Sequence, residues 1–294
     1  MKKNKCIYIF LILVFIKLNF NFILFASVEE TLKSSIYDST IKWKQISKGI
    51  EYTKYTCPKK SIFGNNKIDI IKINPSFFNF YLISSTENKV LNNADFWIKK
   101  NKYNLIFNAG MFKLNDELIH KFYMRNYKSI NNPILNYNAN GIIAFNPKFD
   151  NSPSFKIFDL KKENWSHIDS SYNTLIQGLR MIDSDGFPIY WKSQDQKCSM
   201  LIVSMDKCGN LYVIFSRSPY TQNSMTDILD KMPIELVDAI YLEGGSRANF
   251  VLNCNGFKIK RVGSYVSGYN ENDDNDKFYP FPNFICLKYK KSTN

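Results

Sequence analysis

The sequence has few of the residues from which the commonest catalytic and metal sites are built. It contains two histidines, His120 and His167, and its six cysteines form neither a CxxC pair nor a Cys/His spacing typical of zinc ligands. No serine lies in a GxSxG context, so a Ser-His-Asp site is disfavoured. We therefore expect no zinc site and no serine nucleophile.

The chain also lacks a dense run of lysine and arginine interleaved with aromatic residues, although its formal net charge is +13. Such a run is typical of a nucleic-acid groove, so we predict no nucleic-acid partner. The positive charge favours anionic partners such as envelope glycopolymers or phosphorylated sugars. A lysine- and asparagine-rich composition imposed by an AT-rich genome gives the same charge without any partner.

Residues 1–27 have the layout of a secretory signal. A basic start precedes an apolar run over Cys6–Ile16, and the pair Ala26-Ser27 precedes the first acidic residues. Polar residues interrupt the second half of this segment, which argues against a permanent membrane anchor. We predict a signal peptide, with an uncleaved anchor as the alternative, and an exported protein of the periplasm, cell envelope or exterior. Membrane contact is then expected only through this segment.

No internal repeat or low-complexity linker divides the remaining chain. We expect a polar N-terminal segment over residues 28–66 and one compact domain over residues 67–290. Alternating β-branched residues predict strands over 67–73 and 78–85, and the turn residues between them favour a hairpin.

Later segments add more strands than helices. Strand pairs are predicted over 199–217 and 249–262, whereas capping residues and apolar spacing predict helices over 92–101 and 224–233. The fold class is therefore α+β, with antiparallel-rich mixed sheets and a few packed helices in a single compact domain.

Two short segments share an unusual design. Asn108-Ala109-Gly110 and Glu243-Gly244-Gly245-Ser246 each follow an apolar strand. Glycine lets backbone amides approach a ligand, and consecutive N–H groups bind anions such as phosphate. The alternative is an ordinary glycine turn at a strand end.

Three arginines, Arg180, Arg217 and Arg247, lie at or near strand ends in a chain that otherwise prefers lysine. Arginine offers a planar, bidentate grip on phosphate, although each of these residues is equally compatible with a surface ion pair. The acidic stretch over 270–276 resembles the start of a calcium loop but lacks its glycine and its final acid. We therefore expect no cofactor, with calcium at 272–276 as the alternative.

Taken in order, the segments FNAGMF (107–112), IQGLRMI (176–182), the hairpin over 199–221, YLEGGSRANF (241–250) and the stretch over 263–283 resemble the phosphodiester glycosidase domain family. The resemblance covers residues 67 to 288 and looks closer to a bacterial envelope branch. It implies an exported hydrolase that cleaves the C1–O bond of a glycosyl phosphodiester.

The resemblance also implies site residues. The carboxylates of Glu243 and Asp206 match positions for catalysis, with Glu243 replacing a more usual aspartate. The family's motifs also match Asn108, Gly110, Gln177, Gly244, Gly245 and Ser246, with Arg180 in the strand that follows Gln177. We expect these residues to bind substrate, and we expect Arg247 to do so as an arginine beside the glycine segment.

The chemistry is consistent with these residue types. A phosphomonoester, whose second pKa is about 6, is a good leaving group, so a carboxylate near the anomeric carbon matters more than a strong general acid. Glu243 is the first candidate for the nucleophile or base, and Asp206 is the second. Two alternatives remain: a non-catalytic envelope protein that binds anionic glycopolymers, and a phosphodiesterase that attacks phosphorus.

Overall fold

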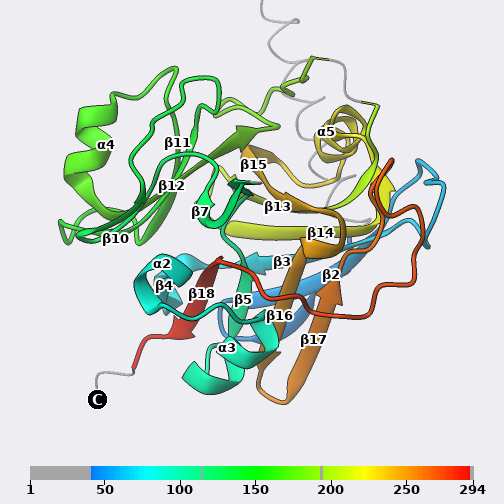
Figure 1. Cartoon of the computed structure of the whole chain (residues 1–294), viewed down its shortest axis with the longest axis horizontal. Coiled ribbons are helices and arrows are strands. Elements are labelled where there is room, and N and C mark those ends of the chain that lie inside the picture. Colours follow the sequence, from blue (N-terminus) through cyan, green and yellow to red (C-terminus); the bar gives the residue numbers. More distant parts are fainter. Residues whose placement is uncertain (1–40, 114, 193–194, 292–294) are drawn as a thin grey trace, which may run out of the picture. The chain divides into compact units, whose positions relative to one another are not determined.

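The computed structural model describes residues 41–113, 115–192 and 195–291. The chain divides into a unit of residues 1–42 and a unit of residues 43–294, and the description below concerns the second unit (Figure 1). The expected signal segment, residues 1–27, lies outside the described residues. Within the described part, no helix is both long enough and apolar enough to cross a bilayer.

An eleven-stranded antiparallel sheet forms one layer of the fold. Its order is β1-β2-β3-β14-β13-β15-β12-β10-β11, with β8 and β9 attached through β12. The strands are β1 (Lys44–Ser47), β2 (Ile50–Thr56), β3 (Lys67–Ile73), β8 (Met124–Asn126), β9 (Ser129–Asn132), β10 (Gly141–Pro147), β11 (Phe155–Asp159), β12 (Tyr172–Arg180), β13 (Cys198–Asp206), β14 (Leu211–Tyr220) and β15 (Leu236–Gly244). Because β1 and β2 belong to this sheet, the second half of the expected N-terminal segment is part of the folded unit.

A five-stranded antiparallel sheet forms a second layer, in the order β17-β16-β5-β18-β4. Its strands are β4 (Phe78–Ser84), β5 (Leu105–Asn108), β16 (Asn249–Cys254), β17 (Phe257–Val262) and β18 (Asn283–Tyr289), and a separate small ribbon consists of β6 (Phe112–Lys113) and β7 (Asp116–His120). The expected hairpin of β3 with β4 is wrong, because these strands lie in different sheets. Pro75 begins the 3-10 helix η1 (Pro75–Phe77), which carries the chain from one layer to the other.

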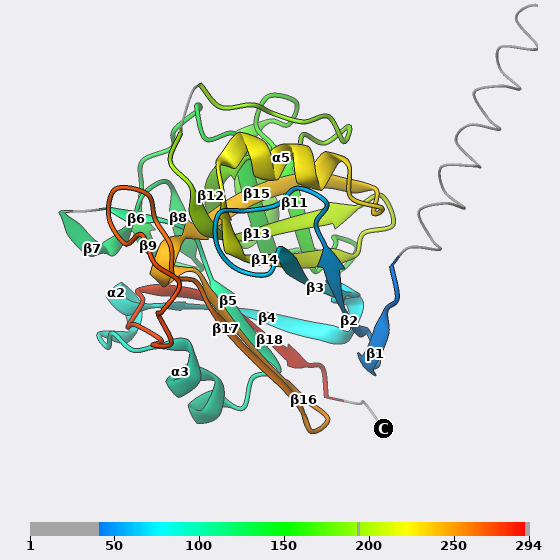
Figure 2. The same cartoon turned by 90° about the vertical axis from the view of Figure 1, so that its right-hand side faces the viewer.

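Short helices lie around the two sheets. They are α2 (Ser85–Asn88), α3 (Ala94–Asn101), α4 (Trp165–Ser171), α5 (Gln222–Asp230) and the 3-10 helix η2 (Gly245–Arg247). The predicted cap of α3 is confirmed, since the Asn93 side chain accepts from the Phe96 amide at 2.9 Å. Thr221 caps α5, three residues before the predicted start. Figure 2 shows α5 above the large sheet and α3 below the small one.

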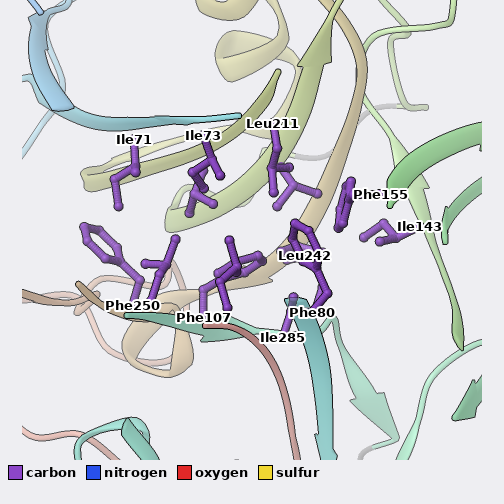
Figure 3. Packing of buried hydrophobic residues seen from close by; sticks show 14 of the residues in the cluster. Ile71, Ile73, Phe80, Phe107, Ile143, Phe155, Leu211, Leu242, Phe250 and Ile285 are labelled. Carbon is purple, nitrogen blue, oxygen red and sulfur yellow. The ribbon is translucent and has the colours of Figure 1, made fainter. Parts of the chain in front are cut away.

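The two largest apolar clusters follow from this layering. The inter-sheet core fills the space between the sheets and includes Ile71, Leu242 and Phe107 (Figure 3). The α5 core lies on the other face of the large sheet and includes Ile70 and Tyr241. Neighbouring strand residues therefore enter different cores, as the two-residue period of a strand requires. The expected α+β class is confirmed.

Candidate active site

The ends of β5 and β15 come together, as the two strand-end segments of the sequence suggested. The side-chain oxygen of Asn108, the last residue of β5, accepts a hydrogen bond from the backbone N–H of Asn249 at 2.7 Å. Asn249 in turn donates from its side-chain amide to the carbonyl of Arg247 at 2.7 Å. Two buried asparagines therefore fix the Gly245–Arg247 turn relative to the small sheet.

A β-bulge sets the direction of the Glu243 side chain. In the pairing of β13 with β15, Leu201 lies opposite Glu243 and Ile202 lies opposite Tyr241, so Leu242 is an extra residue. Leu201 belongs to the inter-sheet core, whereas Tyr241 belongs to the α5 core. The bulge therefore places Glu243 on the face of the large sheet that is turned toward the small sheet.

The Glu243 carboxyl is only half satisfied. It accepts a hydrogen bond from the Gly244 backbone N–H at 2.9 Å through Oε1, while Oε2 is buried without a partner among the described residues. Burial raises the pKa of this carboxyl to about 8, against the opposing effects of the Gly244 amide and the positive charges of Arg247 and Lys121. A buried, unpartnered carboxyl is costly to stability, so it is a candidate for function.

Packing explains both glycines that follow Glu243. A Cβ on Gly244 would lie 2.2 Å from the Tyr241 hydroxyl, and a Cβ on Gly245 would lie 2.1 Å from the Val266 side chain. Gly245 also has a φ of +62°, which favours glycine. The glycines are therefore required by the turn itself, and they bring η2 close to the segment around Val266.

A pocket of about 680 Å³ opens beside this turn. Its lining combines polar, aromatic and charged side chains, and consists of Gly244, Ser246, Arg247, Val266, Tyr269, Asn270, Asp274, Asn275, Asp276, Lys277 and Tyr279. These lining side chains suit a ligand that carries both hydroxyl groups and charge.

Arg247 is held between two aromatic rings beside the pocket. Its guanidinium carbon lies 5.7 Å from the ring centre of Phe112 and 5.5 Å from that of Tyr279. Its Nη1 donates to the carbonyl of Pro280 at 2.8 Å. These contacts fix a cation near Glu243, and a planar guanidinium beside the pocket suits the recognition of an anionic ligand.

Gly110 and His120 pack directly against one another. Gly110 has a φ of +112°, and a Cβ there would lie 2.5 Å from His120 Nε2. His120 is fully buried, its Nδ1 lies 2.9 Å from the carbonyl oxygen of Phe122, and burial lowers the pKa of its imidazole to about 4. The ring is therefore neutral at pH 7 and acts as a packing partner of the Asn108–Gly110 segment.

Sequence reasoning did not assign Lys121 to the site. Its backbone N–H donates to the carbonyl of Met111 at 2.8 Å, so the ribbon of β6 and β7 returns it to the end of the 108–111 segment. Its charge acts on Glu243 together with that of Arg247. The only sequence signal was its position next to His120.

The structure does not bring Arg180 to this site. The Arg180 side chain is buried in the large sheet, where its guanidinium pairs with Asp238 and lies 3.7 Å from an Asp159 oxygen. Its Nη1 donates to the Phe158 carbonyl at 3.2 Å. Arg180 thus neutralises buried carboxylates and is not available for a phosphate near Glu243.

Gln177 also has a local structural role. Its amide nitrogen donates to the carbonyls of Asn136 and Ala139 at 2.7 Å each, and its oxygen accepts from the backbone N–H groups of Asn136 and Tyr123. All four bonds join it to neighbouring backbone, and the residue is fully buried. Gln177 anchors the 136–139 loop.

Asp206 lies at the other end of β13. It pairs with Leu236 across the sheet, whereas Glu243 pairs with Leu201. The five residues between Leu201 and Asp206 span about 16 Å of strand. Paired glycosidase carboxylates are about 5 to 9.5 Å apart, so Asp206 is too distant to act with Glu243.

Asp206 is also fully engaged in its own hairpin. One carboxylate oxygen accepts from the Asn210 backbone at 2.8 Å, and the other accepts from the Tyr212 hydroxyl at 2.9 Å. Its role is to close the turn between β13 and β14.

The 270–276 segment is tied down by Arg217. The guanidinium Nε donates to the Asp273 carboxylate at 2.7 Å, and Nη1 donates to the Asn275 carbonyl at 3.0 Å. In the described ranges, no three His, Cys, Asp or Glu side chains form a group able to hold a metal ion. Arg217 therefore has a structural role, and calcium at 272–276 stays an untested alternative.

Two solved structures share this fold at low sequence identity. A hypothetical protein from Synechocystis matches with a TM-score of 0.58 and 12% identity over 85% of this chain. The zebrafish N-acetylglucosamine-1-phosphodiester alpha-N-acetylglucosaminidase catalytic domain, auto-inhibited by its pro-peptide, matches with a TM-score of 0.57 and 14% identity. This second match covers 85% of this chain and 89% of that domain, whereas the chain spans 64% of the Synechocystis protein.

No family model and no curated protein matches the sequence. The structural comparisons therefore show a shared fold.

Proposed function

We propose that this protein is an exported hydrolase that cleaves the sugar C1–O bond of a glycosyl phosphodiester, with Glu243 as the nucleophile or base. The observation that carries the proposal is the state of the Glu243 carboxyl: one oxygen is buried without a partner, two cations lie near it, and a pocket is lined by the Gly244, Ser246 and Arg247 residues that follow it. The fold shared with a phosphodiester glycosidase catalytic domain supports it.

The reaction needs few groups. Ionised Glu243 either attacks C1 or takes a proton from the water that attacks C1. The C1–O bond breaks, and its electron pair leaves with the phosphate oxygen. In the first case, water then hydrolyses the glycosyl ester and restores the carboxylate. Because the departing phosphomonoester is weakly basic, the positive charge of Arg247 and Lys121 is sufficient to stabilise it.

The proposed site is smaller than the one expected from the sequence. It keeps Glu243 and Arg247, the turn residues Gly244, Gly245 and Ser246, and the supporting Asn108 and Gly110. It gains Lys121 as a second cation. Asp206, Gln177 and Arg180 are excluded from it because their side chains are engaged elsewhere in the fold.

A screen of methyl hexose-1-phosphate diesters, with both anomers and several sugars, tests the proposal in labelled water. We expect hydrolysis with the label in the sugar, and a loss of at least about 100-fold in Glu243→Gln. Label in the phosphate would identify attack at phosphorus instead. Equal binding of an anionic glycopolymer by both proteins, with no product from any diester, would favour the non-catalytic envelope protein.

A further inference from the structure

A second pocket, of about 520 Å³, lies along the free edge of the small sheet. β4 ends the order β17-β16-β5-β18-β4, so one of its edges pairs with no other strand of that sheet. The pocket follows Asn79 to Ile83 of β4, a length of about 13 Å. The lining also includes Trp97, Lys100, Asn101 and Tyr103 from α3 and the turn after it, and Asn126, Tyr127 and Asn146 from the large sheet and its β8–β9 turn. We call this pocket the β4 groove.

The lining of the β4 groove is aromatic and polar but nearly uncharged. Among its fourteen residues are five asparagines, three tyrosines and one tryptophan, but only one charged residue, Lys100. Charged residues make up 22% of the whole chain, so the groove is depleted in charge in a strongly basic protein. An anionic polymer is therefore not the ligand that this lining fits.

The polar groups of the groove have capacity to spare. The side chains of Asn79 and Asn101 donate and accept no hydrogen bond within the described residues, and neither do the hydroxyls of Tyr81, Tyr103 and Tyr127. Tyr81 and Tyr103 lie side by side, with ring centres 5.4 Å apart, and Tyr81 is 38% exposed. Amide groups that both donate and accept, next to exposed ring faces, match a ligand with many hydroxyls and apolar C–H faces.

Tyr127 provides an independent observation. Its φ is +53°, a left-handed conformation that a bulky residue rarely adopts and that glycine adopts at no steric cost. Its ring is 55% exposed and lines the groove, so the fold does not need it for packing. The two-residue turn between β8 and β9 accounts for this backbone conformation, and the turn presents the exposed Tyr127 ring to the groove, where a ligand can contact it.

We propose that the β4 groove binds a neutral oligosaccharide, separately from the chemistry at Glu243. An extended peptide added to β4 is the competing occupant, but such a peptide needs pockets for alternate side chains, and the walls here present amides and hydroxyls instead. The sugar rings pack on Tyr81 and Tyr127, and the asparagine amides bind their hydroxyls.

Calorimetry on the full-length protein with cellohexaose, maltohexaose and chitohexaose tests this proposal. We expect at least one hexasaccharide to bind with a Kd of about 1 mM or tighter. Tyr81→Ala and Tyr127→Gly should each weaken that binding about tenfold, which corresponds to about 1.4 kcal/mol. Tyr127→Gly should not lower the melting temperature, because glycine relieves the backbone.

Three control variants should bind as the wild type does. Asn255→Gly makes the same backbone change at a residue with a φ of +48° that does not line the groove. Tyr137→Ala removes a tyrosine that is 67% exposed elsewhere. Glu243→Gln separates the groove from the proposed hydrolase, so hexasaccharide binding without any hydrolase activity would leave this proposal standing.

The proposal fails if no hexasaccharide binds, or if binding survives both tyrosine substitutions unchanged. Binding of extended decapeptides in place of hexasaccharides, with backbone amide shifts along β4, would also overturn it and identify a strand-addition site.

Discussion

Two buried ionisable side chains on neighbouring strands, Glu243 on β15 and Arg180 on β12, have opposite surroundings. Arg180 pairs with Asp238, lies near Asp159 and donates to a carbonyl. Glu243 receives one backbone hydrogen bond and leaves its other oxygen without a partner. A buried charge held in ion pairs supports the fold even though the Nε of Arg180 has no partner, whereas the half-satisfied carboxyl of Glu243 costs stability and marks a candidate site. Both residues looked equally functional in the sequence.

Removing the satisfied charge should have the largest effect on stability. Arg180→Ala leaves the carboxyls of Asp238 and Asp159 buried without their cation, so the free energy of unfolding should fall by about 3 to 5 kcal/mol. Denaturant unfolding at pH 7 measures this loss. A change below about 1 kcal/mol would show that the ion pair is not structural, and the contrast with Glu243 would break.

Replacing Glu243 should change the free energy of unfolding in the opposite direction, toward greater stability. The pKa of Glu243 is about 8 in the folded protein, against 4.5 as its ordinary value, so the folded state holds a proton that the unfolded state releases. This difference in pKa stabilises the folded state fully below pH 4.5, and the stabilisation is lost as the pH rises through 8. Glu243→Gln should therefore match the stability of the wild type at pH 4.5 and exceed it by a few kcal/mol at pH 9.

Thermal unfolding at the two pH values checks this sign, with Glu235→Gln, an exposed carboxylate, as the matched control. The same ionisation predicts that hydrolysis by the wild type rises with pH through about 8. Parallel stability curves for the two variants would contradict the raised pKa of Glu243.

Replacing Arg247 by lysine tests the arginine near Glu243 against the buried Arg180. Arg247→Lys keeps the charge but loses the planar group between Phe112 and Tyr279. We expect KM for a phosphodiester to rise about tenfold with a smaller change in kcat. Arg217→Lys is not a suitable control, because Arg217 holds the 270–276 segment. The control is Arg261→Lys, which makes the same change at an arginine paired to Asp69. An unchanged KM in Arg247→Lys would remove this residue from phosphate binding.

The smallest effect is expected at the other candidate carboxylate. Asp206→Asn keeps an acceptor for the Asn210 amide but weakens the bond from Tyr212, so stability should fall by about 1 kcal/mol. Turnover per folded molecule should be unchanged. A loss as large as that of Glu243→Gln would place Asp206 in the catalytic machinery.

Much of the fold could be predicted because local patterns determine it. The alternation in β3 and β4, the Asn93 cap of α3 and the Asn255-Gly256 turn all have sequence signals that depend on near neighbours. The sheet that each strand joins does not have such a signal. β3 and β4 were therefore paired in the prediction, although each strand packs its apolar face against the other's layer.

The site was harder to predict because partners decide it. Arg180 and Arg247 both lie at or just after strand ends. Only the fold reveals that Asp238, 58 residues away in the sequence, lies beside Arg180. Lys121 carries no motif and joins the site through a backbone bond to Met111. Glu243 could be identified because the glycines beside it are required by close packing and are visible in the sequence.

The extra residue Leu242 in the pairing of β15 with β13 decides which face of the large sheet carries the Glu243 side chain. A regular ladder that kept Leu242 would place Leu242 opposite Leu201 and turn the Glu243 carboxyl toward Tyr241 and the α5 core. The carboxyl would then point into the apolar α5 core, away from the small sheet. A one-residue bulge in the pairing of two ordinary strands is thus enough to convert a packing position into a candidate catalytic one.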